Sequence, residues 1–389
     1  MHQSIRLAAD FVKYGKFILL GLILLAVAGS LQASTLTVGC PSGGTYTSVQ
    51  AAVNAAAPGD VIVVTGICTE SVFIGDMAFL TIQANSPGSG TIVALTDNDA
   101  IDIQRSHGIV LVNLIFSGGT GSVAGAGVAA FDNAQVVINN CTIQNHVDVG
   151  VFLDLSTRVN INGSTIQGNG DGVDVSRESI AIIRRSTIVK NVAVGVFALD
   201  RSAVQFAQAN EVAGNGDTGI FLQDLSRVVL GGGPNSTTVE NNVSAGVVIA
   251  AQSLFRAQPN SKIKNNGAGC TPGNFCGGVV ALRNSTLRFN LVEVSGNTGD
   301  GIEVDQGVDV GINGSTVSNN TENGLRIRHL SIGDFVTANT FAGNGGASVS
   351  CDETSVLTGD LTGMTKVKCG RIEQAHPRSE KMKEMKEMD

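Results

Sequence analysis

The chain has 389 residues and a formal net charge of −8, with 49 glycines, 7 prolines and no tryptophan. At 43% hydrophobic residues it is long enough to bury a large core, and the glycine content favours many tight turns over long helices. No basic stripe is present to neutralise phosphates, so nucleic acid is excluded as an expected partner.

The N-terminus predicts an export signal. Lys13 and Lys16 precede an apolar run at 17–31, and Ala33 offers a small residue at a plausible cleavage point. The run of about 15 residues is short for a membrane span of roughly 20. We therefore expect a signal peptide at 1–33, no membrane span after its cleavage, and a secreted, periplasmic or cell-surface protein. A retained anchor stays open, because the segment before the run is longer than usual.

All seven cysteines follow this leader, so they lie in a compartment where disulfides persist. Proximity in the chain predicts three disulfides: Cys40 with Cys68, Cys270 with Cys276, and Cys351 with Cys369. Cys141 is left without a partner in this scheme.

From about residue 127 the chain repeats a glycine followed by alternating apolar residues, and each unit carries a second short apolar segment. Alternation over four or five residues bounded by Gly and Asn predicts strands, and a recurring unit of about 22–32 residues predicts a solenoid. The repeating glycines are Gly127, Gly150, Gly172, Gly195, Gly219, Gly246, Gly278, Gly301 and Gly324.

Two further columns keep the same spacing. Asparagines precede the glycines, and we expect their side chains to hydrogen-bond from coil to coil. They are Asn191, Asn215, Asn242, Asn274, Asn297 and Asn320, with Asn145 and Asn169 displaced by one. Small residues follow the glycines, and they are Cys141, Ser164, Ser186, Ala209, Ser315 and Ala338. Cys141 is therefore expected to be a buried, inert thiol.

The pattern resembles the right-handed parallel β-helix of the pectin-lyase-like superfold, over roughly residues 35–370. The opening "GGTYTSVQAAVNAAAPGDVIVV" is similar to the start of many such proteins. The resemblance implies an all-β solenoid at 34–370, a short capping helix at about Ser48–Ala56 and a closing coil with its own disulfide. The charged segment 371–389 is expected to be a tail outside the fold.

The second residue after each repeating glycine is expected to face outward, because side chains alternate along a strand. At one end, Glu303 and Asp305 stand two and four residues after their repeating glycine, and Arg326 and Arg328 stand at the same positions in the next coil. This predicts two in-register ion pairs, Glu303–Arg326 and Asp305–Arg328. The middle of this column is apolar, with Phe152, Phe197, Phe221, Val248 and Val280. Such a strip is either a binding surface for a glycan or protein, or is covered by a loop, the tail or another chain.

The stretch "GNGDGVDVSR" at 168–177 resembles the polygalacturonase segment that supplies a catalytic carboxylate. Asp174 is the candidate, and Asp154 is expected about 8 Å away, a separation that suits an inverting pair of carboxylates. Arg177 is near enough to join them. The chain departs from that family, because it has no adjacent Asp-Asp and no Gly-His-Gly. A turn of the repeat is therefore the alternative interpretation of Asp174.

No metal or cofactor site is predicted from spacing. Asp154, Asp174 and Asp200 offer oxygen ligands for calcium, although no spaced calcium loop is present. Zinc spacing and a nucleotide-binding glycine motif are also missing from the sequence.

Two classes of function remain open. The first is a non-catalytic exported solenoid that binds a glycan or protein. The second is a divergent polysaccharide lyase, hydrolase or epimerase acting on an acidic glycan in the groove around Asp174. The scarcity of Trp and Tyr favours the first class, since those rings commonly pack against sugars.

Overall fold

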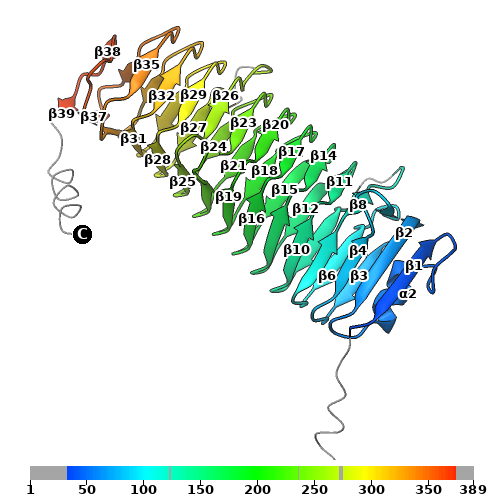
Figure 1. Cartoon of the computed structure of the whole chain (residues 1–389). Coiled ribbons are helices and arrows are strands. Elements are labelled where there is room, and N and C mark those ends of the chain that lie inside the picture. Colours follow the sequence, from blue (N-terminus) through cyan, green and yellow to red (C-terminus); the bar gives the residue numbers. More distant parts are fainter. Residues whose placement is uncertain (1–32, 122–123, 235, 271–274, 374–389) are drawn as a thin grey trace, which may run out of the picture.

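The computed structural model describes residues 33–121, 124–234, 236–270 and 275–373. The predicted signal peptide at 1–33 and tail at 371–389 lie almost entirely outside these residues. The described chain winds into an elongated solenoid whose coils stack along one axis (Figure 1). Its strands pair in parallel, and α2 (Val49–Ala55) is the one helix in the described ranges, which confirms the predicted all-β solenoid.

One sheet of 13 strands forms the first face of the solenoid. Its strands are β3 (Val72–Gly75), β6 (Ile101–Gln104), β9 (Val128–Phe131), β12 (Val149–Leu153), β15 (Asp171–Val175), β18 (Val196–Ala198), β21 (Ile220–Leu222), β24 (Val247–Ile249), β27 (Val279–Leu282), β30 (Ile302–Asp305), β33 (Leu325–Ile327), β36 (Val349–Cys351) and β38 (Val367–Lys368). We call this the groove face.

A second sheet of 26 strands forms the two other faces, which share β2 (Val61–Thr69). One face holds β1 (Thr35–Cys40), β4 (Thr81–Ala84), β7 (Ile109–Val112), β10 (Gln135–Asn139), β13 (Arg158–Asn162), β16 (Ile180–Arg184), β19 (Ala203–Ala207), β22 (Arg227–Leu230), β25 (Leu254–Ala257), β28 (Thr286–Asn290), β31 (Asp309–Asn313), β34 (Ile332–Phe335), β37 (Val356–Gly359) and β39 (Ile372–Glu373). The other holds β5 (Gly90–Val93), β8 (Leu114–Ser117), β11 (Thr142–Gln144), β14 (Thr165–Gln167), β17 (Thr187–Val189), β20 (Glu211–Ala213), β23 (Thr238–Glu240), β26 (Lys262–Lys264), β29 (Glu293–Ser295), β32 (Thr316–Ser318) and β35 (Thr340–Ala342).

The core is a continuous column of aliphatic side chains inside the coils. Each strand sends alternate residues inward, as Val173 and Val175 do from β15, and both are fully buried. Stacked coils place like residues above one another, as where Ile166 pairs with Ile188. Because every coil buries its apolar residues against its neighbours, the repeat explains both the core and the strand register.

A ladder of buried asparagines runs through the turns, as predicted. From Asn191 onward, each side-chain oxygen accepts from the backbone and side-chain amides of the asparagine one coil earlier. Its members are Asn169, Asn191, Asn215, Asn242, Asn266, Asn297, Asn320 and Asn344. Asn274, which was assigned to this ladder, lies outside the described residues, and Asn266 occupies the rung between Asn242 and Asn297. The assignment of Asn145 was wrong, because the backbone N–H that donates to Asn169 belongs to His146.

The column of small residues also forms a hydrogen-bonded ladder, in which Ser164 and Ser186 accept from the backbone of the preceding coil. Its next rung is Asn210 and not Ala209, because Asn210 supplies the acceptor for the Ser186 N–H. Asn339 likewise replaces Ala338. A further ladder went unnoticed in the sequence, and it consists of Ser179, Ser202, Ser226 and Ser253.

His146 is an exception to the asparagine ladder. Its ring is only 2% exposed and the buried Nε2 has no hydrogen-bond partner. Burial lowers the pKa of His146 to about 4. As the pH falls below 6.5, the unfolded chain binds a proton at His146 that the native state does not bind. The free energy of unfolding therefore decreases with falling pH, down to about pH 4.

We expect His146→Asn to raise the free energy of unfolding, because an asparagine here extends the ladder to Asn169. The gain is larger at low pH, since removing the histidine also removes a penalty of about 2 kcal/mol at pH 5. Urea denaturation of both proteins at pH 7.5 and pH 5 measures this difference. An equal effect at the two pH values would contradict the account.

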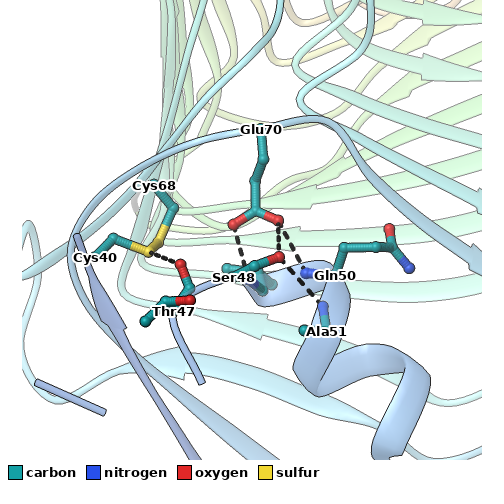
Figure 2. The surroundings of a disulfide bond; sticks show 8 residues. Cys40, Thr47, Ser48, Gln50, Ala51, Cys68 and Glu70 are labelled. Carbon is teal, nitrogen blue, oxygen red and sulfur yellow. Dashed lines mark hydrogen bonds between the residues drawn. A yellow bond between two sulfur atoms is a disulfide. The ribbon is translucent and has the colours of Figure 1, made fainter. Parts of the chain in front are cut away.

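The first coil is closed by the short helix α2, as the resemblance implied, and Ser48 is the N-cap of this helix. The Glu70 carboxylate accepts from the Val49 and Gln50 backbone amides at 2.7 and 2.9 Å and from the Ser48 hydroxyl (Figure 2). The adjacent disulfide between Cys40 and Cys68 ties β1 to the end of β2. Ligand atoms of Cys40, Cys68 and Glu70 lie close together, but the disulfide and the helix cap already use them.

The three predicted disulfides are all present: Cys40–Cys68, Cys270–Cys276 and Cys351–Cys369. Cys141 is a free, buried thiol, and burial raises its pKa to about 12, as expected for an inert side chain. The parallel pairing continues to Ile372 and Glu373, just past the predicted start of the tail. Within the described ranges, no helix has the length and hydropathy that a membrane span requires.

Candidate functional site

The outward column of the groove face has the predicted register. Phe152 pairs with Asp174, Asp174 with Phe197, and Phe197 with Phe221 across successive strands. The Phe197 and Phe221 rings lie 5.4 Å apart between centroids. The three phenylalanines are half-buried and flank Asp174 in the order that the sequence predicted.

The apolar strip does not continue as an exposed surface. Val248 is fully buried and Val280 is 2% exposed, so these two outward positions are covered and offer no binding surface. They pack with Ala245, and Phe221 and Leu282 pack against this cluster. The larger neighbours on the same face thus bury the small valines, which leaves Phe152, Phe197 and Phe221 as the accessible members of the five candidates.

A groove of 490 Å³ opens on the groove face beside Asp174. Its lining residues are Asp97, Asn98, Asp99, Gly125, Ala126, Phe131, Asp148, Val149, Phe152 and Asp174. The Phe131 and Phe152 rings meet edge to face with centroids 5.5 Å apart. We call this hollow the acidic groove.

Several residues of the acidic groove were missed in the sequence. Phe131 stands four residues after Gly127, an offset that alternation along the strand also turns outward, so the sequence contained a signal for it. Asp97, Asp99 and Asp148 lie in the connections before β6 and β12, outside the strand columns. A search confined to strand positions could not find them.

Asp174 is one of the carboxyl groups that line this groove. The Ser176 hydroxyl donates to its Oδ1 at 2.8 Å. Burial raises the pKa of Asp174 to about 6, and the negative charges of Asp171, Asp154 and Asp148 add to the effect. A carboxylic acid with this pKa stores and releases a proton near neutral pH.

Asp154 and Arg177 form a separate ion pair. Asp154 is 2% exposed, and its Oδ1 accepts from Arg177 Nε at 2.6 Å and from the Leu155 backbone at 2.9 Å. Arg177 Nη2 contacts the second oxygen. Both carboxylate oxygens are therefore occupied, and neither residue lines the acidic groove. Of the two carboxyl groups predicted as a pair, Asp154 is bound to Arg177, and only Asp174 lines the acidic groove.

A second hollow of 690 Å³ runs along the turns that follow β9 to β21. It is lined by Asp132, Asn133, Leu155, Ser156, Arg177, Glu178, Asp200, Arg201, Asp224 and Leu225. Arg201 pairs with Glu178 at 2.9 Å. Asp200 lies here rather than beside Asp174, and the described residues do not bring Asp154, Asp174 and Asp200 together as one set of calcium ligands.

The charged end of the groove face differs from the prediction in its pairing. Arg328 contacts both Glu303 and Asp305, the latter at 3.3 Å, which confirms the Asp305–Arg328 pair. Glu303 and Arg326 are in register, but Arg326 instead approaches Asp300 at 3.6 Å. Arg328 is thus the guanidinium that reaches back to Glu303, so the predicted Glu303–Arg326 ion pair was wrong.

Comparison with known proteins matches residues 64–209 to the family described as "Right handed beta helix region". The periplasmic alginate epimerase AlgG, in a variant form, is similar in structure with a TM-score of 0.59 at 15% identity, over 82% of this chain and 79% of that chain. The mannuronan C-5 epimerase AlgE6 A-module of Azotobacter vinelandii has a TM-score of 0.55 at 14% identity, over 85% and 94%. None of the curated proteins matches the chain. These likenesses, together with the parallel coils, establish that the chain is a right-handed parallel β-helix protein.

Proposed function

We propose that this protein is an exported, non-catalytic solenoid that binds a glycan in the acidic groove. The observation that carries the proposal is the groove itself, in which half-buried aromatic rings and carboxylates line one hollow. Its volume of 490 Å³ falls within the range of about 300–1,000 Å³ that is typical of small-ligand sites.

The chemistry of the lining suits a saccharide. Carboxylate oxygens of Asp99, Asp148 and Asp174 accept hydrogen bonds from sugar hydroxyl groups. The rings of Phe131 and Phe152 offer apolar surface to the C–H face of a sugar. AlgG and AlgE6 are named as alginate and mannuronan epimerases, and this supports a glycan over a protein as ligand of the same fold.

Export is part of the proposal. The three disulfides favour an oxidising compartment, and they agree with the predicted signal peptide at 1–33. A secreted, periplasmic or cell-surface location would bring the groove face into contact with extracellular polysaccharide. The solenoid at 34–370 would then be the functional unit, with 371–389 as an appended tail.

We expect Phe152→Ala to weaken glycan binding at least tenfold, because it removes one wall of the groove. Isothermal titration with a panel of neutral, acidic and amino-sugar oligosaccharides measures the affinity. Phe79→Ala is the matched control, since Phe79 is 68% exposed and is not among the lining residues. Equal losses in both variants, or no binding of any oligosaccharide, would overturn the proposal.

A second candidate is acid catalysis on a glycan, and the pKa of about 6 at Asp174 favours it. In a lyase, hydrolase or epimerase, Asp174 would carry the proton that is transferred, with Asp148 as the nearest lining carboxylate from the adjacent coil. The protonated form is lost as the pH rises through about 6, so activity that needs the acid declines above that pH.

Asp174→Asn is expected to abolish any such turnover and, at pH 7, to raise the free energy of unfolding by about 1–3 kcal/mol. The stability gain follows because burial destabilises the charged carboxylate. The unfolded chain loses the Asp174 proton above about pH 4 and the native state only above about pH 6, so the cost of the buried charge is fully present at pH 7, and the amide has no charge to desolvate. Reducing-end and unsaturated-product assays together with urea denaturation measure both effects. Unchanged turnover would remove Asp174 from a mechanism, and a loss of stability would contradict its raised pKa.

A further inference from the structure

The acidic groove combines negative charge with an absence of basic side chains among its described lining residues. Asp97 and Asp99 line one side, while Asp148 and Asp174 come from the connection before β12 and from β15. Asp171 and Asp102 also lie on the groove face. Burial is the main cause of their raised pKa values, and nearby carboxylates raise these pKa values further. The groove is thus a region of negative potential.

Two arginines that follow strands of the groove face, Arg105 after β6 and Arg177 after β15, are engaged elsewhere. Arg105 donates to both oxygens of Asp76, at 2.8 and 3.0 Å, and approaches Asp132 at 3.6 Å. Arg177 is paired with Asp154. Neither guanidinium lines the acidic groove. The carboxylates of the groove repel one another, and the described lining residues include no basic side chain to offset this repulsion.

We propose that the acidic groove selects a glycan with free amino groups, and that it rejects uronate glycans. The inference rests on the proposed glycan-binding function and names the substrate class. An ammonium group close to a carboxylate is attracted by it, and the attraction is stronger in a partly buried groove than in bulk water. A uronate carboxylate at the same place is repelled by a similar amount.

The structure favours an organic ammonium over a metal ion as the bound cation. Calcium needs several oxygen ligands that converge on one point. Among the described residues, the acidic side chains of this groove do not bring three ligand atoms within 4.8 Å of one another. An ammonium group requires only separate hydrogen-bond acceptors, and the Phe131 and Phe152 rings supply the apolar surface that a sugar ring needs.

Isothermal titration at about pH 6.5 tests this selectivity with the purified protein. The ligands are a β-1,4-linked glucosamine oligomer, its fully N-acetylated form, and an oligogalacturonate with and without calcium. We expect the free amine to bind at least tenfold tighter than the N-acetylated form and the uronate to bind weakest. Asp174→Asn reduces this preference several-fold, whereas Glu211→Gln on β20, which does not line the groove, leaves it unchanged.

The outcomes separate the selectivity from the glycan-binding function. Equal or tighter binding of the N-acetylated oligomer or the uronate, lost in Phe152→Ala, overturns the selectivity and leaves the glycan-binding groove standing. Uronate binding that appears only with calcium identifies a metal as the cation and also overturns the inference. No binding of any oligomer overturns the proposed function together with the selectivity.

Discussion

Replacing Asn297 with alanine is expected to lower the free energy of unfolding by about 3 kcal/mol or more. The fully buried Asn297 side chain accepts from the Asn266 backbone and side-chain amides, both at 3.0 Å, and donates to Asn320 Oδ1 at 2.9 Å and to the Ile263 carbonyl at 3.2 Å. Alanine removes all four bonds, and each buried polar group left unpaired costs about 1–3 kcal/mol.

Asn162→Ala is the matched control for the ladder. The Asn162 side chain donates a hydrogen bond of 2.9 Å to Asn139 Oδ1, on the outward side of β13. We expect a loss of about 0.5–1.5 kcal/mol there. Urea denaturation of the two variants measures the difference in the free energy of unfolding. Equal losses would show that the buried hydrogen bonds of Asn297 contribute no more to stability than the single bond of Asn162.

Gly246→Ala is expected to be similarly severe, at about 3 kcal/mol or more, because the repeating glycines touch the next coil. A Cβ at Gly246 would lie 2.7 Å from the Gly278 carbonyl oxygen, from Asn266 Nδ2 and from Ile263 Cγ2. The first of these is a backbone atom, so the clash is relieved only if the coils separate. Overpacking typically costs about 1–3 kcal/mol, and we expect the upper end of this range or more because the backbone cannot move aside.

Gly370→Ala serves as the control, since nothing lies within 4 Å of a Cβ at that position. Its expected effect on the free energy of unfolding is within about 0.5 kcal/mol of zero. Thermal and urea melts of both variants report the comparison. A tolerated Gly246→Ala would show that the spacing of the coils adjusts easily, contrary to the close contact in the structure.

The fold was predictable because stacking makes the sequence periodic. Each coil repeats three features: a glycine with no room for a Cβ, an asparagine that hydrogen-bonds to the asparagine of the next coil, and strand residues that alternately point inward. A single sequence therefore shows the same pattern many times. The buried Cys141 followed from the same spacing, whereas the disulfides followed from proximity in the chain. Insertions broke the register locally, which is why Asn274 was chosen where Asn266 forms the rung.

The candidate site was only partly predictable, for two physical reasons. Alternation along a strand gives the direction of Val248 and Val280, but their burial depends on the size of neighbours such as Phe221 and Leu282. Charge pairing depends on side-chain length, so Arg328 reaches back to Glu303 and Arg177 reaches Asp154. Connections between strands contribute Asp97 and Asp148 to the groove, and no periodicity marks them.

The most direct test of a glycan-binding groove is a crystal structure of the protein soaked with the oligosaccharide that binds most tightly in titration. The account predicts a sugar ring against Phe131 and Phe152 with polar contacts to Asp174. A ligand seated instead in the hollow along the turns at Asp200 and Arg201, or beside Glu303 and His329, would contradict it.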